Sequence, residues 1–316
     1  MESEVLVTAR GQYVADDWLP VTRGVRRHAQ APDAFAATLA AWLAVLPSGA
    51  CFTHLTAARL HGWWLPPLPD DLPVFVALPP GSHRVRRPGL VTLRRKEPTT
   101  PEWMGGLPVE PAMTILATCA RDLGVLDLVC LVDAALATGQ MDPAVLGGAG
   151  VRGARGVSRL RRAIELSDPR AESIYEVLLR VLHVVCEVPV EPQFEVRDEA
   201  GGVVARGDLH LIGTRTLHEY DGGEHLTRPG QRKDLKRDRR LGHVGWSRRG
   251  YTREDVLFQA PTILRDADAS IGRDHEPSRI RAWHALMRES LFTPAGTARL
   301  AETLGLGGRL TRAASR

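Results

Sequence analysis

The spacing of apolar side chains predicts six regular elements in the C-terminal half of the chain. Apolar residues from 174 to 185 recur at helical spacing, after Asp168 and Pro169, which are typical of an N-cap and a first helical position. Alternation then predicts three strands, at 193–197, 203–212 and 216–221. A helix at 231–241, ended by Gly242, and a strand opening at Val244 complete the order αβββαβ. This order is typical of a small mixed sheet covered by helices on both faces.

The pattern of the remaining chain predicts a mixed helical and hairpin domain before this core and helices after it. Short apolar pieces before residue 30 predict a β-rich segment, and apolar runs at 74–78 and 90–93, joined by an arginine-rich loop, predict a basic β-hairpin. Helices are expected at 35–46, from Thr53 or His54 to Gly62, from Pro111, at 124–137, around Ile280, Trp283 and Met287, and at 294–304. The predicted class is α/β (α+β), with domains at 1–165, 166–260 and 261–316.

Composition and charge narrow the class of protein. Apolar residues make up 44% and charged residues 25% of the 316 positions, which is the balance of a globular protein. The start, MESEV, lacks the features of a secretory signal, and the longest apolar run is shorter than the roughly 20 residues of a membrane span. We therefore expect a cytoplasmic protein with no membrane partner. The four scattered cysteines form no CxxC pattern and are expected to be buried thiols.

One basic segment stands out in a chain whose net charge is only +4. Between Arg232 and Arg249 there are eight Lys or Arg residues and two Asp, a local excess of +6. Such a segment attracts phosphate groups. A solvated, arginine-rich helix is the alternative that the composition leaves open.

The loop between the second and third strands predicts which carboxylates face each other. A two-residue type II′ turn at Gly213 and Thr214 would, by counting outward, place Asp208 directly opposite Glu219. Asp221 projects from the same face, two residues further on. Facing carboxylates repel each other unless a cation lies between them, so we expect a hard divalent ion such as Mg²⁺. The alternative is that each acid pairs with a nearby arginine.

A resemblance to a known family covers roughly residues 6–139. It is carried by CFTHLTAARLHGWWLPP, GLPVEPAMTILATCARDLG and LDLVCLVDAALATG, which resemble the actinobacterial relatives of abortive-infection type IV antitoxins. Those antitoxins share an N-terminal winged helix that binds DNA, and only a remnant of its wing fits before Phe35. The resemblance implies an antitoxin-like domain with a toxin or another protein as partner. His54 and His61 are expected to be a cap and a packed side chain, not metal ligands.

A second resemblance covers roughly residues 168–256. RAESIYEVLLR, VARGDLHLI, HEYDGGEH and RKDLKRDRRL resemble the PD-(D/E)xK superfamily of restriction-endonuclease-like proteins, in the branch similar to very-short-patch-repair endonucleases. The resemblance implies that Asp208 and Glu219 bind the metal, with Glu176 contributed by the preceding helix. Asp221 stands where the superfamily has a lysine, so this chain departs from the pattern at one catalytic position.

Other residues are candidates for the roles that the missing lysine leaves open. His225 lies in a glycine-flexible loop and is the candidate general base, with Lys233 as the alternative. Asp234 and Arg237, spaced DxxR, resemble the helix signature of the branch, which implies that they brace the acidic cluster and contact phosphate. Lys233, Arg237 and Arg240 are the predicted nucleic-acid-binding residues.

Two functions from different classes follow from these patterns. The first is a nuclease, dependent on Mg²⁺ or Mn²⁺, that hydrolyses phosphodiester bonds in DNA. The second is an antitoxin-like or regulatory binding protein that retains the nuclease fold without catalysis. The complete set of acids favours the enzyme, and the missing lysine favours the binding protein. The sequence leaves open the choice between DNA and RNA, the partner and the oligomeric state.

Overall fold

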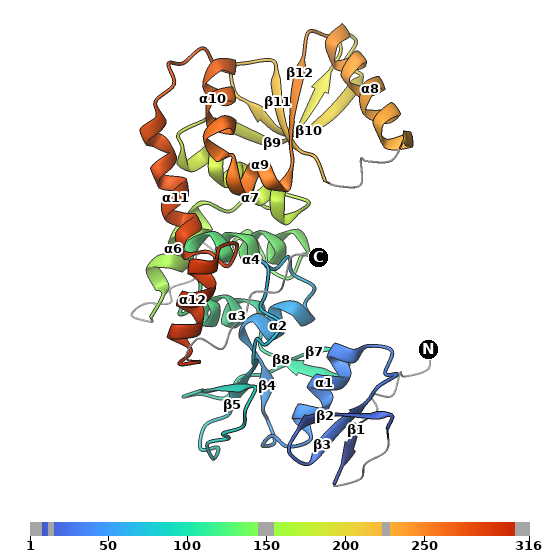
Figure 1. Ribbon diagram of the computed structural model, residues 1–316, viewed down its shortest axis with the longest axis vertical. Coiled ribbons are helices and arrows are strands. Elements are labelled where there is room, and N and C mark those ends of the chain that lie inside the picture. Colours follow the sequence, from blue (N-terminus) through green and yellow to red (C-terminus); the bar gives the residue numbers. More distant parts are fainter. Residues whose placement is uncertain (1–7, 12–15, 145–154, 223–227, 307–316) are drawn as a thin grey trace. The chain divides into compact units, whose positions relative to one another are not determined.

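The computed structural model describes residues 8–11, 16–144, 155–222 and 228–306, without the side chains of 8–10 and 228–234. The chain divides into two compact units, whose elements are labelled in Figure 1. Unit 1 comprises Met1–Trp63, Leu68–Asp122 and Ala301–Arg316, and unit 2 comprises Trp64–Pro67 and Leu123–Leu300. Both units combine helices with sheets, which confirms the mixed α and β class. No helix within the described ranges is long and apolar enough to cross a membrane.

The described residues of unit 1 between 8 and 122 form two sheets and three helices. The first sheet, in the order β1-β3-β2, is antiparallel and consists of β1 (Thr8–Arg10), β2 (Trp18–Thr22) and β3 (Val25–His28). The second has the order β6-β5-β4-β8-β7 and consists of β4 (Cys51–Phe52), β5 (Val74–Leu78), β6 (Leu90–Arg94), β7 (Glu102–Met104) and β8 (Leu107–Val109). The helices are α1 (Ala34–Leu43), α2 (His54–Leu60) and α3 (Ala112–Cys119).

The pairing of β5 with β6 corrects one expectation. The sequence predicted an antiparallel hairpin, but the two strands are parallel, with Val74 opposite Leu90. Parallel neighbours need a connection that carries the chain back along the sheet. Residues 79–89 provide it, and the Thr92 hydroxyl of β6 donates to the Val85 carbonyl of this loop at 3.5 Å. The arginine-rich loop therefore runs beside β6 instead of closing a tight turn.

The two histidines near α2 are packed side chains, as predicted. His54 is fully buried and stacks on Phe75, with ring centroids 4.2 Å apart. His61 is the C-cap residue of α2 and stacks on Trp63. His54 adopts a φ of 54°, a left-handed conformation that is rare for residues other than glycine. The N-cap position itself belongs to Thr53.

Unit 2 is built on a four-stranded mixed sheet in the order β12-β11-β10-β9. Its strands are β9 (Val190–Arg197), β10 (Val203–Leu211), β11 (Thr216–Tyr220) and β12 (Ser247–Tyr251). Helix α7 (Ile174–Val185) precedes β9, and α8 (Arg228–His243) connects β11 to the parallel strand β12. The predicted order αβββαβ is therefore present. On β11, His218 contacts His183 of α7 while Leu217 packs with Leu241 of α8, so the two helices cover opposite faces.

The other helices of unit 2 surround α7. They are α4 (Val125–Ala137), α6 (Val157–Glu165), α9 (Arg253–Phe258), α10 (Ala260–Ser270), the short 3₁₀ helix η2 (Pro277–Arg279) and α11 (Ile280–Glu289). A last helix, α12 (Pro294–Thr303), follows. Helix α4 is buried almost all round, as predicted, and its Asp133 forms a buried ion pair with Arg180 of α7 at 2.7 Å. Residues 6–139, which the sequence analysis treated as one stretch, are thus divided, because α4 folds with the second unit.

Several element boundaries of unit 2 differ from the predicted ones. Helix α7 begins after Ser173, whose hydroxyl accepts from the Glu176 N–H at 3.3 Å, and not after Asp168. The Asp168 carboxylate is instead occupied by Arg170, at 2.8 Å. Helix α8 continues to His243, and Gly245, not Gly242, adopts the left-handed conformation. Strand β12 therefore begins three residues later than predicted, at Ser247.

Candidate functional site: an acidic cluster on the sheet of unit 2

The hairpin of β10 and β11 has the predicted register. Leu209 pairs with His218 and His210 pairs with Leu217. Extended by one residue, this register sets Asp208 across from Glu219. The prediction of which strand positions oppose each other is therefore confirmed at the pairs that form.

The turn that produces this register is not the predicted one. The loop has four residues, 212–215, and the Thr214 N–H donates to the Leu211 carbonyl at 3.1 Å. Gly213 occupies the third position of that turn with a φ of 87°, as a type II turn requires. Loops of two and four residues centred on the same point preserve the same pairing, so the register is correct although the turn type was wrong.

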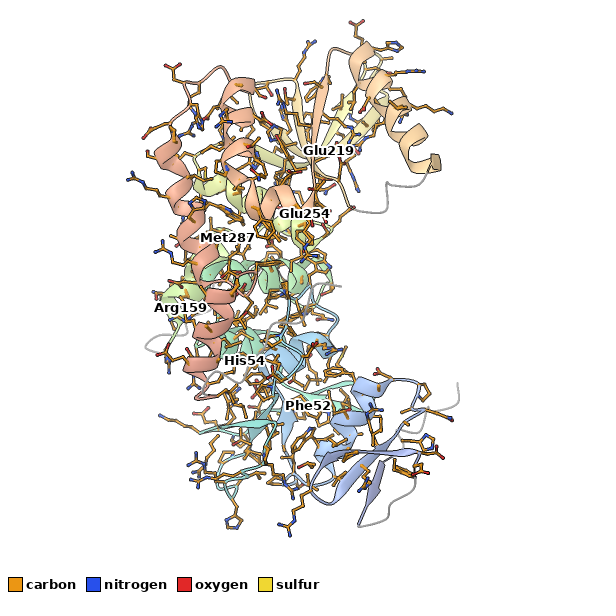
Figure 2. The ribbon with its side chains drawn as sticks, in the orientation of Figure 1. Phe52, His54, Arg159, Glu219, Glu254 and Met287 are labelled. Atoms are coloured by element: carbon orange, nitrogen blue, oxygen red, sulfur yellow. The ribbon has the colours of Figure 1, made fainter. Side chains whose placement is uncertain are left out.

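Glu219 lies at the centre of the cluster and is only 3% exposed (Figure 2). Arg237 of α8 donates to both of its oxygens, with Nη1–Oε2 at 2.9 Å and Nη2–Oε1 at 2.7 Å. Arg248 of β12 adds a third contact at 3.2 Å. Burial, opposed by both arginines and assisted by the charge of Asp208, raises the pKa of Glu219 to about 7.

Asp208 and Asp221 flank Glu219. Oδ2 of Asp208 accepts from the Tyr220 N–H at 2.8 Å, while burial, together with the charge of Asp221, raises the pKa of Asp208. Asp221 shares Arg248 with Glu219, at 3.2 Å from its Oδ1. Its carboxylate lies over Gly250, where an added Cβ would come within 1.7 Å of Oδ2. A side chain at position 250 would displace Asp221, so the glycine makes room for the cluster.

Glu176 reaches the same group from the first turn of α7. Its Oε2 accepts from the Glu172 N–H at 2.8 Å and from the Gln193 side-chain amide at 3.0 Å. Burial raises the pKa of Glu176, and the charge of Asp208 contributes to that rise. Gln193 adopts a φ of 53°, and such strained backbone often marks functional sites. The sequence analysis missed Gln193, because its place in an alternating strand carries no signal.

The structure brings together most, but not all, of the predicted site residues. Glu176, Asp208, Glu219 and Asp221 interact with one another or through shared arginines, and Arg240 is exposed on α8. Arg237 pairs with Glu219 and also donates to the Arg206 carbonyl. The predicted roles of His225 and of the Lys233 and Asp234 side chains lie outside the described residues.

Arg248 is the main contributor that the sequence analysis did not single out. It was counted only as one charge of the basic segment, because β12 was not known to be parallel to β11. That pairing sets Leu217 opposite Arg248 and Glu219 opposite Gly250. The Arg248 guanidinium consequently contacts Glu219, Asp221 and Asp238 of α8, and its side chain is only 13% exposed.

The cluster fits a hard divalent cation in its donor chemistry. Oδ1 of Asp208 accepts no hydrogen bond from any described residue. Burial is the largest cause of the raised pKa values of Glu176, Asp208 and Glu219, and the charges of neighbouring acids add to it. No three His, Cys, Asp or Glu side chains within the described residues are already arranged at metal-binding distances. Binding would therefore require Glu219 to exchange a guanidinium contact for the ion.

Comparison of the chain with protein-family models, with curated proteins and with solved structures finds no match. The chemistry of the site is therefore inferred from its own residues. Buried acids can bind a cation, and guanidinium groups held beside them can oppose the charge of a phosphate. Buried acids and guanidinium groups lie side by side at Glu219, Arg237 and Arg248 of unit 2.

A chain of buried polar groups lies on the opposite face of β11. His183 Nδ1 lies 2.7 Å from the Leu179 carbonyl, which can only accept, so this nitrogen carries the proton. His183 Nε2 then accepts from His218 Nδ1–H at 2.9 Å, and the unprotonated Nε2 of His218 faces the Tyr251 hydroxyl at 3.4 Å. Burial lowers the pKa of His183 to about 4 and that of His218 to about 2. Both rings are neutral in the folded protein.

These histidines should make the protein less stable in mild acid. Below their ordinary pKa the unfolded chain binds protons that the folded chain rejects, so stability falls as the pH falls. Between about pH 7.5 and about pH 5, we expect wild type to lose about 2 to 4 kcal/mol more than the double variant His183→Gln/His218→Gln. Urea unfolding of both proteins at both pH values measures this difference. The carboxylates titrate in the same way in both proteins, so their contribution cancels. Equal losses would contradict the assignment of neutral, buried rings.

Proposed function

We propose that the protein is a nuclease that hydrolyses phosphodiester bonds in DNA as an endonuclease dependent on Mg²⁺ or Mn²⁺. The observation that carries the proposal is the gathering of three carboxylates, Glu176, Asp208 and Glu219, whose pKa values are raised by burial and by the negative charges of their acidic neighbours. A divalent ion, when bound, would offset this charge and supply an activated water and Lewis acidity toward a phosphate. The likeness of the C-terminal segments to PD-(D/E)xK nucleases supports the same chemistry.

Each residue of the cluster has a distinct part in this proposal. Asp208, Glu219 and Glu176 would hold the ion, and Asp208 has an unoccupied oxygen for it. Arg248 provides the fixed positive charge that the superfamily's lysine provides elsewhere, because its guanidinium lies between Glu219 and Asp221. His225 is the proposed general base, and the exposed side chain of Arg240 attracts the phosphate backbone.

One observation favours the alternative of a binding protein without catalysis. Arg237 donates to both oxygens of Glu219, so that carboxylate is already satisfied without a metal. In that case the arginines and acids would form a structural ion-pair network. The two proposals differ in whether a divalent ion binds at all.

A cleavage assay separates the two. Purified protein is incubated with supercoiled plasmid DNA and with a labelled RNA, each with Mg²⁺, with Mn²⁺ and with EDTA. We expect nicked or linear DNA with either metal and no product with EDTA. Cleavage of RNA alone would change the substrate but retain the chemistry. If neither nucleic acid is cut with either metal, the nuclease proposal fails and the binding protein becomes the better account.

A further inference from the structure

A group of unpaired arginines lies in unit 1, far along the sequence from the acidic cluster. Arg23 is in the turn between β2 and β3, while Arg84, Arg86 and Arg87 belong to the loop that connects β5 to β6. Two contacts join these segments, because Arg87 Nη1 donates to the Arg23 carbonyl at 2.8 Å and to the Thr22 hydroxyl at 3.5 Å. We call these four residues the arginine surface.

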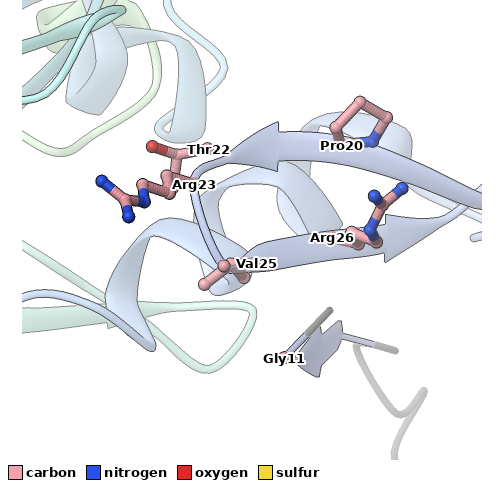
Figure 3. A pocket seen from close by; sticks show the side chains of 7 residues that line it. Gly11, Pro20, Thr22, Arg23, Val25 and Arg26 are labelled. Carbon is pink, nitrogen blue, oxygen red and sulfur yellow. The ribbon is translucent and has the colours of Figure 1, made fainter. Parts of the chain in front are cut away.

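The side chains of Arg23, Arg84 and Arg86 are directed to solvent, whereas Arg87 is half-buried. Val85 is half-buried, and its carbonyl accepts from Thr92 of β6, so the middle of the loop is attached to the sheet edge. Its neighbours Arg84 and Arg86 are both exposed. In an extended segment, residues on either side of an inward-facing position point away from the sheet. Arg23 is exposed as well and projects outward from its turn (Figure 3).

The charges of the arginine surface are not neutralised. Within the described part of the chain, no carboxylate forms an ion pair with Arg23, Arg84, Arg86 or Arg87. Arg95, a few residues further on, shows the contrast, because it is paired with the buried carboxylate of Glu110. Uncompensated guanidinium groups repel one another, and their fork of donors fits the oxygens of phosphate and carboxylate anions.

A cavity of about 600 Å³ adjoins this surface. It is lined by Gly11, Thr22, Arg23, Gly24 and Arg26, together with Pro20 and Val25. Figure 3 shows the Arg26 side chain rising from β3 toward Pro20 of β2. The space beside Gly11 and Gly24 is open, because an added Cβ would meet no atom within 4 Å at either position. The backbone is therefore open to close approach by a ligand at these two positions.

We propose that the arginine surface of unit 1 binds the phosphate backbone of nucleic acid, independently of base sequence. An extended polyanion fits several guanidinium groups distributed over two segments better than a small anion does. Phosphate contacts by arginine supply affinity without sequence information. The proposal does not depend on catalysis by unit 2, since none of these residues belongs to the acidic cluster.

The test is the salt dependence of DNA binding in EDTA, which prevents metal-dependent cleavage. Fluorescence anisotropy of a short labelled duplex compares wild type with Arg23→Gln/Arg84→Gln/Arg86→Gln between about 50 and 200 mM salt. We expect about 10- to 100-fold weaker binding and a salt slope reduced by about 3, close to one per lost phosphate contact. Arg87 is left unchanged because it joins the two segments. A thermal melt checks that the triple variant is folded.

The control removes the same charge elsewhere, in Arg162→Gln/Arg281→Gln/Arg288→Gln, which changes exposed arginines on helices of unit 2. It should bind the duplex within about 3-fold of wild type. Equal losses in both triple variants would mean that only net charge matters and would overturn the proposal. Tighter binding of a labelled polyglutamate peptide than of DNA would also overturn it, in favour of an acidic protein partner. Because EDTA removes the divalent ions that the nuclease proposal needs, failure of that proposal would leave this result intact.

Discussion

Asp208→Asn should reduce phosphodiester cleavage by at least about 10³-fold and leave the fold intact. Asparagine keeps the side-chain oxygen that accepts from the Tyr220 N–H, which is 2.8 Å away, so the local structure is retained. It removes the negative charge that a divalent ion needs. Because burial raises the pKa of Asp208 in the folded protein, loss of the charge should not lower stability at about pH 8.

Two measurements distinguish this result from unfolding. The first is the cleavage rate. Its control is Asp274→Asn, which changes an exposed aspartate in the loop before η2. The second is the rise in Tm on addition of Mn²⁺, because an ion that binds only the folded state stabilises it. Wild type and Asp274→Asn should show both the activity and the shift, and Asp208→Asn neither. Retention of full activity by Asp208→Asn would exclude Asp208 as a metal ligand.

Glu219 is less suitable than Asp208 for a substitution test of metal binding, because its carboxylate is held in ion pairs. Facing carboxylates suggest that removing either acid relieves repulsion. The structure instead pairs Glu219 with Arg237 and Arg248, and its side chain is only 4% exposed. Glu219→Ala would leave Arg237 without its carboxylate partner and Arg248 with one partner fewer, so a loss of activity in that variant would be confounded by a loss of stability.

Arg180→Met should lower the free energy of unfolding by about 3 to 5 kcal/mol. Arg180 is 4% exposed, pairs with Asp133 of α4 at 2.7 Å and donates to the Leu166 carbonyl at 2.6 Å. Methionine fills a similar volume but leaves the Asp133 carboxylate buried without its cation. The exposed pair of Arg162 and Glu165 is the matched control, and Arg162→Met should cost less than about 1 kcal/mol.

The effect of Arg180→Met should also depend on pH. Burial raises the pKa of Asp133 to about 7 even though Arg180 lowers it, and without the arginine the pKa should rise further. A carboxyl whose pKa is higher in the folded state loses stability as the pH rises. Urea unfolding should therefore show a larger loss at about pH 8 than at about pH 5, and Asp133→Asn/Arg180→Met should recover part of it. A loss no greater than that of Arg162→Met would show that the pair does not hold α4 to α7.

Much of unit 2 was predictable because local patterns determine its elements. The apolar positions of α7, the alternation in β10 and β11 and the short loop between them depend on residues close in sequence. The facing of Asp208 and Glu219 followed from the same local count. The amphipathic helix containing Ile280, Trp283 and Met287 was predictable for the same reason, and all three side chains are buried in the structure.

What the sequence by itself determined, then, was the order of elements and the pairing across one tight loop. Only the tertiary structure decided that β5 and β6 are parallel and that β12 lies beside β11. Strand direction across a long connection depends on where the chain returns to the sheet, and no local pattern encodes that return. The position of Arg248 against Glu219 follows from β12, so the cation that stands in for the expected lysine was hidden in the sequence. Arg248 and Glu219 come together because β12 packs beside β11, and that packing depends on contacts between residues that are distant in the chain.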